Sequence, residues 1–305
     1  MNELCYVNGR IVPITESVLR ADDAGFQLGL SVFDTLLYED GCFYFVEDHL
    51  ERLRGGAQAL SIRMPSREVQ LEALRTLRDA VDADCLALRM TVTRGPGGGE
   101  PTFMITVREV HRPSDPGIVL RIATERRMAG DPMSRLKSTN RLPYILAREQ
   151  AVREGAWEAL FLSHEGDAME GTVSNFFCVT DGVLKTAAVE RGCLPGTVRA
   201  LLIEELGSHP VEVEGSELEC RVDRVTQADL RAASEMFMTN TTGRIIPVCE
   251  LRGLGEAEDE SRTLVGSDGP VVKALWARVR ELEASYRVDQ LKNGIGSKNG
   301  HPGGR

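Results

Sequence analysis

The sequence lacks the patterns that mark disulfide scaffolds, zinc proteins and membrane proteins. Its seven cysteines are scattered and include no C-x-x-C pair, which argues against a disulfide framework or a zinc site and fits reduced thiols in the cytoplasm. No apolar run reaches the roughly 18 residues that a membrane helix needs, and the first residues form neither a basic region nor a long apolar one. We therefore expect a cytoplasmic protein without a metal centre, a signal peptide or a membrane span.

A surplus of basic residues is also absent. The chain has 36 lysines and arginines against 46 aspartates and glutamates, which gives a formal net charge of −10. This balance argues against nucleic acid or an anionic membrane as a partner, although it leaves room for a small basic site that binds a phosphate. With 305 residues, of which 42% are hydrophobic and 27% charged, the chain has the composition of a globular protein of two ordinary domains.

The first 112 residues show strand patterns on either side of two helix patterns. Asn8-Gly9 and Asp40-Gly41 each separate two short apolar stretches, and they predict hairpin turns. Asp48 and Ser66 each precede a segment whose apolar residues recur on one face, as in an amphipathic helix. This order of elements indicates a small α+β domain at residues 1–112. The expected strands are 4–7, 10–13, 35–38, 42–45, 85–93 and 102–108.

A linker with two prolines, residues 111–117, precedes a second mixed domain that we place at residues 118–287. Gly155 is expected to stop one of its helices and Gly207 another. Residues 288–305 are rich in Gly, Asn and Lys, which predicts a flexible tail. The expected elements are strands 118–124, 159–163, 175–180, 183–186, 236–239 and 245–248, and helices 142–153, 197–206 and 270–287.

Composition and periodicity lead only to a two-domain α+β enzyme of unknown chemistry, but several separated motifs lead further. They are DAGFQLGLSVFDT at 23–35 with HLERL at 49–53, LKSTNRLP at 136–143, MEGTVSNFF at 169–177, CLPGTVR at 193–199, and FMTNTTGRIIPV at 237–248. In this order and spacing they resemble the class IV (fold type IV) aminotransferases, which depend on pyridoxal 5′-phosphate (PLP). That family includes branched-chain aminotransferases, D-amino-acid aminotransferases and 4-amino-4-deoxychorismate lyases.

The resemblance covers roughly residues 4 to 285 and carries expectations for the architecture. It implies a small N-terminal α/β domain, a larger C-terminal domain with a barrel-like β core, and a homodimer. It also implies that the partners of the protein are PLP and small substrates, an amino acid and a 2-oxo acid.

The resemblance also names the residues that hold the reactive part of the cofactor. Lys137 is the catalytic residue and forms a Schiff base with PLP, a role that a lysine can fill when partial desolvation and nearby cations lower its proton affinity. Glu170 faces the pyridine nitrogen, where a carboxylate keeps that nitrogen protonated and the ring an electron sink. Asn140 matches the asparagine of the family motif K-x-x-N.

The cofactor phosphate is assigned by the same resemblance to three places in the chain. Arg52 supplies a guanidinium, which suits a phosphate because it can form two parallel charge-assisted hydrogen bonds. Thr197 and Val198 open a helix whose first N–H groups can bind an anion. Thr241 and Thr242 lie in a late loop whose hydroxyls complete the phosphate site.

Four further residues are candidates for the substrate pocket: Leu28, Phe33, Arg94 and Arg141. Arg141 stands where branched-chain enzymes have a tyrosine that bonds the cofactor phenolate, and an arginine there is closer to the lyases. The loop 93–100, TRGPGGGE, lacks the R-x-H pair of D-amino-acid aminotransferases. We expect a ping-pong aminotransferase for hydrophobic or branched amino acids. The alternatives are a 4-amino-4-deoxychorismate lyase, a D-amino-acid aminotransferase, or a binding protein that keeps the fold without activity.

Overall fold

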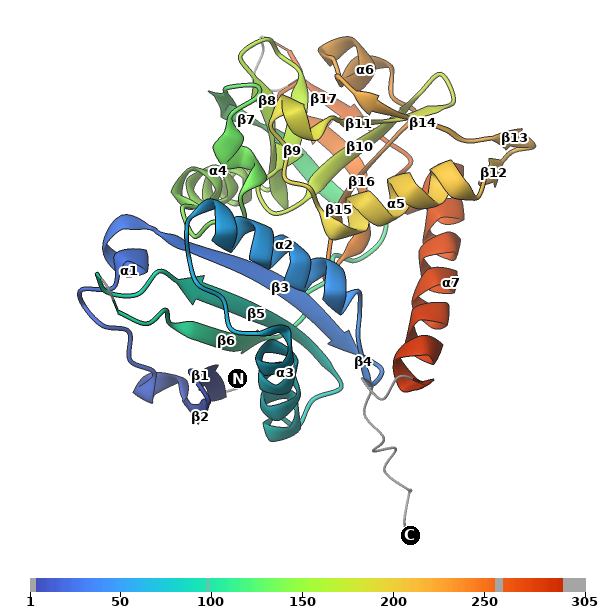
Figure 1. Cartoon of the computed structure of the whole chain (residues 1–305). Helices are drawn as coiled ribbons and strands as arrows, with labels where there is room; N and C mark the ends of the chain where they lie inside the picture. The colour runs from blue at the N-terminus through green and yellow to red at the C-terminus, as the bar shows by residue number, and fades with distance from the viewer. Residues whose placement is uncertain (1–3, 98, 256–259, 293–305) are drawn as a thin grey trace. The chain divides into compact units, whose positions relative to one another are not determined.

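The computed structural model describes residues 4–97, 99–255 and 260–292, and its chain divides into two compact units. The first unit comprises the residues up to His111, the four residues Lys137–Asn140, and the residues from Glu281 on. The second unit comprises Arg112–Leu136 and Arg141–Arg280. Figure 1 labels their helices and strands. Among the described residues, no helix combines the length and the apolar character needed to cross a bilayer.

A six-stranded antiparallel sheet forms the centre of the first unit, in the order β2-β1-β6-β5-β3-β4. The predicted turns lie at its hairpins: Asn8 and Gly9 both have positive φ angles, as the tight turn between β1 and β2 requires. Apolar residues of α2 and α3 pack with those of the sheet in one cluster. The elements are β1 (Leu4–Val7), β2 (Arg10–Pro13), η1 (Ile14–Glu16), α1 (Ala24–Leu28), β3 (Ser31–Glu39), β4 (Cys42–Phe43), α2 (Val46–Ala59), α3 (Arg67–Ala80), β5 (Cys85–Thr93) and β6 (Phe103–Arg108).

The two helices of this sheet differ in how well their starts could be predicted. Ser66 caps α3 as expected, since its side chain accepts a hydrogen bond from the N–H of Val69. α2 begins at Val46, two residues before the expected Asp48. The hydroxyl of Tyr286, far away in the sequence, accepts the N–H of Val46 at 3.0 Å, so this helix start needs no local side-chain cap.

The units differ from the sequence-based division into residues 1–112 and 118–287 at two places. Lys137–Asn140 belongs with the first unit because it continues the sheet beside β3: the N–H of Phe33 donates to the carbonyl of Lys137 at 2.9 Å. Residues from Glu281 on also belong there, and the ring of Tyr286 packs against Phe45 at 4.9 Å.

Six strands of the second unit close into a barrel, in the order β10-β15-β16-β7-β8-β9, and β9 returns to β10. The closing pair is Glu170 with Asn175. β11 and β14 extend the sheet from β10, and β17 pairs with β16. The elements are β7 (Ile118–Arg127), η2 (Pro132–Arg135), α4 (Leu142–Arg153), β8 (Glu158–Ser163), β9 (Ala168–Gly171), β10 (Asn175–Thr180), β11 (Val183–Ala187), η3 (Val189–Arg191), α5 (Thr197–Ser208), β12 (Glu212–Val213), β13 (Ser216–Glu217), β14 (Glu219–Asp223), α6 (Gln227–Ala232), β15 (Glu235–Asn240), β16 (Arg244–Arg252), β17 (Ser261–Thr263), η4 (Gly266–Asp268) and α7 (Pro270–Lys292).

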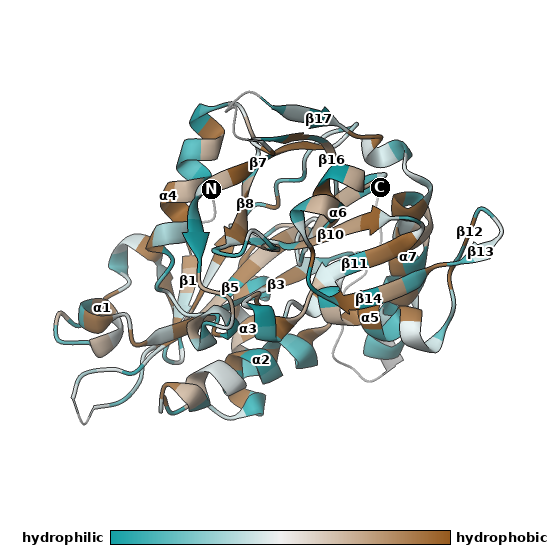
Figure 2. Ribbon diagram, turned by 90° about the horizontal axis from the view of Figure 1, so that it is seen from above, coloured by the Kyte–Doolittle hydropathy of each residue, from teal (hydrophilic) through white to brown (hydrophobic). Residues whose placement is uncertain are grey.

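β8 and β10 are buried at every position, and the hydropathy colours show apolar stretches in the barrel strands (Figure 2). Phe176 and Met238 belong to the cluster that all six strands share. On the opposite face of β10 and β15, Phe177 and Phe237 stack at 5.0 Å and pack with apolar residues of α5 and α7. The α+β class and the barrel-like core expected from the sequence are confirmed.

Two helix ends were predicted wrongly. α5 continues through Gly207 to Ser208. α7 continues to Lys292, so the expected flexible tail is wrong for residues 288–292, and its remaining residues lie outside the described part of the chain. The sequence of α7 has no glycine or proline between residues 271 and 292, and the amide of Gln290 donates to the hydroxyl of Tyr286 one turn earlier.

Candidate active site

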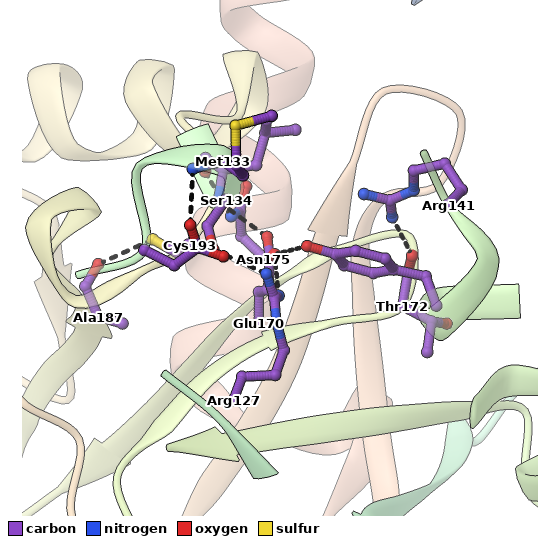
Figure 3. A network of polar contacts seen from close by, with 12 residues as sticks. Arg127, Met133, Ser134, Arg141, Glu170, Thr172, Asn175, Ala187 and Cys193 are labelled. Atoms are coloured by element: carbon purple, nitrogen blue, oxygen red, sulfur yellow. Dashed lines mark hydrogen bonds and ion pairs between the residues drawn. The ribbon is translucent and has the colours of Figure 1, made fainter. Parts of the chain in front are cut away.

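Glu170 is the centre of a buried polar network in the second unit (Figure 3). It lies on β9 with a relative exposure of 4%. Its Oε1 accepts from Nη1 of Arg127 at 2.8 Å and from the hydroxyl of Tyr144 at 3.0 Å, and its Oε2 accepts from the N–H of Leu194 at 2.8 Å. Because both oxygens are held by donors, the carboxylate has one fixed orientation.

Arg127 reaches this carboxylate because β7 is longer than expected. A register shift between Ile122 and Arg126 interrupts the regular pairing of β7 with β8, and the strand then continues to Arg127. The second arm of Arg127, Nη2, donates to Ser134 Oγ at 2.7 Å, and its guanidinium lies 4.6 Å from the centre of the Tyr144 ring. The cation is therefore fixed by contacts on three sides.

Tyr144 and Arg141 stack in the same network, with the Arg141 guanidinium 3.4 Å from the ring centre of Tyr144. Nη2 of Arg141 donates to the carbonyl of Thr172 at 2.5 Å. Burial raises the pKa of the Tyr144 phenol, and the nearby charge of Glu170 adds to this rise. Burial likewise lowers the pKa of Arg141. The structure thus places Arg141, a predicted pocket residue, in the surroundings of Glu170.

The helix start predicted for phosphate is formed by α5. Its N-cap is Gly196, and no side chain caps the first N–H groups, which include those of Thr197 and Val198. A Cβ at Gly196 would lie 1.9 Å from Oδ1 of Asn175, whose amide donates to the carbonyl of Leu194 at 2.8 Å. Asn175 therefore fixes this turn and requires a glycine in it.

The loop with Thr241 and Thr242 is held by Asn240, the last residue of β15, which directly precedes it. Oδ1 of Asn240 accepts from the N–H of Gly243 at 2.7 Å and from the hydroxyl of Thr242 at 3.3 Å. The preceding Thr239 is buried, and its hydroxyl has no hydrogen-bond partner among the residues that the structure describes. An unsatisfied buried hydroxyl next to this loop fits a site that binds a polar group.

In the first unit, Arg52 pairs with a buried carboxylate. Its Nε and Nη2 each lie 2.7 Å from an oxygen of Asp34, which has no exposed surface. Nδ1 of His49, one turn earlier on α2, lies 2.8 Å from the same carboxylate. The spacing H-L-x-R of the sequence motif thus brings both side chains to one acidic residue on β3.

Lys137 lies in the short segment that pairs with β3. Its Nζ is 4.9 Å from the ring centre of Phe33, and the guanidinium of Arg89 lies 3.5 Å from the same centre. The structure therefore brings Lys137 together with Phe33, a predicted pocket residue, whose ring is also contacted by Arg89.

The other predicted residues of the first unit have different surroundings. Asn140 Nδ2 donates to the carbonyl of Gly29 at 3.2 Å, so this residue secures the segment that carries Lys137. Leu28 is 69% exposed on α1. Arg94 is exposed, and its guanidinium donates to the carbonyl of Leu60.

Sequence reasoning missed Arg127 and Tyr144. Arg127 follows a strand bulge that breaks the alternation of apolar residues, so the strand appeared to end at residue 124. Tyr144 stands in the sequence seven residues after Lys137, in the first turn of α4, where an aromatic residue next to the motif was the available signal. Both residues become recognisable only through their hydrogen bonds to Glu170.

Comparison with known proteins gives one consistent family. The family model for class IV aminotransferases matches residues 31–251. A putative branched-chain-amino-acid aminotransferase of Methanocaldococcus jannaschii is 33% identical over 81% of this chain and 88% of its own length. The aminodeoxychorismate lyase of Bacillus subtilis is 28% identical over 81% of this chain and 86% of its own length.

The fold is found in solved structures as well. The branched-chain amino acid aminotransferase of Escherichia coli superposes with a TM-score of 0.80 at 22% identity, over 93% of this chain and 95% of that chain. At 22% identity, this similarity is evidence for the fold alone.

Proposed function

This chain belongs to the class IV aminotransferases, and we propose that it transfers an amino group from a hydrophobic or branched-chain amino acid to a 2-oxo acid. Enzymes of this family use PLP. The observation that carries the proposal is the carboxylate of Glu170, which is buried and held in one orientation by Arg127, Tyr144 and the N–H of Leu194. A fixed carboxylate of this kind suits the nitrogen of a pyridine ring.

The second unit also fits the phosphate of PLP. The first N–H groups of α5 are free of a side-chain cap, and a helix start favours a dianion. The unsatisfied hydroxyl of Thr239 and the loop of Thr241 and Thr242 add polar groups of the kind that bind phosphate oxygens. The match of its motif to the family also makes Arg52 a proposed phosphate ligand. The side chain of Val198 belongs to the apolar core, so only its N–H serves this purpose.

When bound, PLP supplies an electron sink for the electrons of a cleaved Cα–H bond. In the proposed mechanism Lys137 would hold PLP through its Nζ. The same Nζ would act as the base that takes the proton from Cα of the substrate. Glu170 would keep the ring nitrogen protonated. Water would supply the oxygen of the 2-oxo acid that is released, and the amino group would remain on the cofactor until the acceptor takes it up.

The substrate class rests on apolar residues and on relatives. The buried ring of Phe33 lies beside Lys137, which favours an apolar substrate side chain. The Methanocaldococcus relative is described as a putative branched-chain enzyme. Leu28 stays a proposed pocket residue, although it is exposed in the single chain.

Elimination of pyruvate from 4-amino-4-deoxychorismate is the second candidate activity. Arg141, which is partly buried and stacked on Tyr144, favours it, since an arginine at this point of the motif resembles the lyases. The relative from Bacillus subtilis is such a lyase. Both reactions need Lys137 and Glu170, so the substrate decides between them.

A substrate panel tests the proposed function. Purified protein with PLP is given leucine, valine or D-alanine with 2-oxoglutarate, and separately 4-amino-4-deoxychorismate, and the products are measured. We expect turnover of the branched amino acids, and turnover of 4-amino-4-deoxychorismate alone would contradict it. K137A is expected to abolish turnover and the visible absorbance of the bound cofactor. K273A, which removes an exposed lysine paired with Asp268, is the matched control.

We also propose a homodimer in the cytoplasm. Leu142, Ile145 and Leu146 of α4 are each more than half exposed, as residues of a subunit contact are in a single chain. All seven cysteines are unpaired, which suits a reducing compartment. Sedimentation of the purified protein tests the first point, and a monomer at micromolar concentration would contradict it. Cell fractionation tests the second.

A further inference from the structure

Glu158 is a buried carboxylate to which the proposed mechanism gives no task. It is the first residue of β8 and has no exposed surface. Its Oε1 accepts from the N–H of Val173 at 2.6 Å and from the hydroxyl of Thr172 at 3.3 Å. Its Oε2 accepts from the hydroxyl of Ser174 at 2.9 Å. All three donors come from the turn that joins β9, with Glu170, to β10.

The turn is packed directly onto this carboxylate. A Cβ on Gly171 would lie 2.4 Å from Oε1 of Glu158, so only a glycine permits the approach. Burial raises the pKa of Glu158, while the donors of residues 172–174 oppose the rise. Burying an acidic group in this way is costly unless hydrogen bonds compensate for the lost water.

Ser174 connects the carboxylate to the loop of Thr241 and Thr242. The amide Nδ2 of Asn240 donates to the hydroxyl oxygen of Ser174 at 3.0 Å. Oδ1 of Asn240 accepts from the N–H of Gly243 at 2.7 Å. Three hydrogen bonds therefore link Glu158, through two side chains, to the main chain of the loop.

The direction of each bond in this chain is fixed. A main-chain N–H can only donate, so the atom of Asn240 that faces Gly243 is the oxygen, and the atom that faces Ser174 is the nitrogen. The hydroxyl of Ser174 accepts that bond and directs its own hydrogen to Oε2 of Glu158. This relay of hydrogen bonds, which runs from Glu158 through Ser174 and Asn240 to Gly243, thus requires an oxygen without a hydrogen at Oε2.

We propose that Glu158 is a positioning residue that fixes the loop of residues 241–243 for the cofactor phosphate through Ser174 and Asn240. The same carboxylate holds the turn whose carbonyl at Thr172 receives the guanidinium of Arg141. This inference rests on the proposed function, because it takes Thr241 and Thr242 as phosphate ligands.

Glu158→Gln tests the relay with little change in volume. The N–H of Val173 keeps the amide oxygen, so the new NH₂ group faces Ser174 and removes the acceptor that the relay needs. We expect the affinity for PLP to fall roughly tenfold, the effect of losing one hydrogen bond to a charged group. The affinity for pyridoxal, which has no phosphate, is expected to change much less. We also expect faster hydrogen exchange at the amide of Gly243 in the cofactor-free protein.

Glu235→Gln is the matched control. Glu235 is a carboxylate of the same unit, 3% exposed, and it accepts the N–H groups of Val271 and Val272 at the start of α7. Its substitution is expected to lower stability without changing the ratio of PLP to pyridoxal affinity or the exchange of Gly243. Ser174→Ala, which breaks the relay at its middle, is expected to show the same two changes as Glu158→Gln, and the double variant is expected to add little to either.

Two results would overturn the inference. One is a ratio of PLP to pyridoxal affinity that stays at the wild-type value in both Glu158→Gln and Ser174→Ala. The other is a hydrogen-exchange rate at the amide of Gly243 that is no faster in these two variants than in Glu235→Gln. Failure of the proposed function has different signatures. Turnover of 4-amino-4-deoxychorismate alone would refute the aminotransferase but leave this inference standing, whereas a wild-type protein that binds no PLP would refute the cofactor site itself. In that case the exchange experiment still shows whether the relay orders the loop, while the role toward phosphate is refuted.

Discussion

Arg52 contacts both oxygens of the Asp34 carboxylate, with Nε 2.7 Å from Oδ2 and Nη2 2.7 Å from Oδ1. Burial alone would raise the pKa of Asp34, but the charges of Arg52 and then of His49 hold it well below its usual range. The carboxylate is thus an anion whose position determines where the guanidinium points. A cation held in this way loses little freedom when it binds a phosphate.

Asp34→Asn is expected to weaken PLP binding and to destabilise the fold. Removing one partner of a buried ion pair leaves the other charge uncompensated, at a cost of about 3–5 kcal/mol. PLP titration and urea unfolding measure the two effects. Asp22→Asn is the control, because its pair with Arg20 is exposed and contributes little. Wild-type affinity and stability in Asp34→Asn would show that Asp34 does not orient Arg52.

Stability of the cofactor-free protein is expected to depend on His49 between pH 7 and pH 5. Burial lowers the pKa of His49, and the charges of Arg52 and Lys137 add to this, while Asp34 acts against it. The unfolded imidazole, with a pKa near 6.5, therefore takes up a proton before the folded one does. The free energy of unfolding falls as the pH drops below 6.5, by at most about 1.4 kcal/mol per pH unit from this group.

His49→Asn provides the comparison, since its amide can donate to Asp34 but does not titrate. Urea unfolding at several pH values is expected to show a smaller slope between pH 7 and pH 5 in the variant. Asp34 does not interfere in this range, because a lowered carboxyl pKa costs stability only below its unfolded value of 3.8. An equal dependence of the unfolding free energy on pH in both proteins would exclude His49 as the source of that dependence.

Local signals predicted much of the fold. The bounds of β5 and α4 agree with the expected 85–93 and 142–153, because turns and stops flank a clear pattern in each. β9 was missed, since its four residues are all buried and show no alternation. Its existence depends on pairing with β8 and β10, which no window of sequence contains.

The candidate site shows the same limit. Motifs could name Lys137 and Glu170, since a residue type at a fixed spacing is visible in the sequence. The partners of Glu170 could not be named, because Arg127 reaches it after a bulge and Leu194 through a main-chain N–H. Contacts between distant segments depend on the closed barrel, and only the structure provides them.

Gly29→Ala is expected to disturb the segment that carries Lys137. Gly29 has a φ of 67°, and an added Cβ would lie 2.0 Å from Oδ1 of Asn140. Gly41→Ala is a matched control, with a φ of 78° and nothing within 4 Å of the added atom. The control is expected to lose about 1–2 kcal/mol of stability from backbone strain alone.

Gly29→Ala is expected to lose more than this control and to bind PLP more weakly. Adding Asn140→Ala removes the clash, so the double variant is expected to regain stability relative to Gly29→Ala. Thermal unfolding and PLP titration of the three variants measure this. Equal losses in Gly29→Ala and Gly41→Ala would show that the contact with Asn140 does not constrain the segment.

Arg127 and Tyr144 donate to the same oxygen of Glu170, yet their removal is expected to differ in effect. Tyr144→Phe deletes one neutral donor and keeps the ring that Arg141 stacks on, so kcat is expected to fall roughly threefold to tenfold, as for one ordinary hydrogen bond. Arg127→Gln removes the only charge paired with the buried Glu170 among the described ion pairs. The buried carboxylate of Glu170 then has no described ion-pair partner to offset its lost hydration, so the loss of stability is expected to approach that of Asp34→Asn.

The same two variants separate effects on the cofactor from effects on the fold. Tyr144→Phe is expected to keep the wild-type affinity for PLP within a few-fold and to unfold near the wild-type temperature, since Arg127 and Leu194 still hold the carboxylate. Arg127→Gln is expected to lower both. Single-turnover kinetics with leucine, PLP titration and thermal unfolding give the three readouts. If Tyr144→Phe lowered the PLP affinity and the unfolding temperature as much as Arg127→Gln does, the phenol rather than the ion pair would be the main support of Glu170.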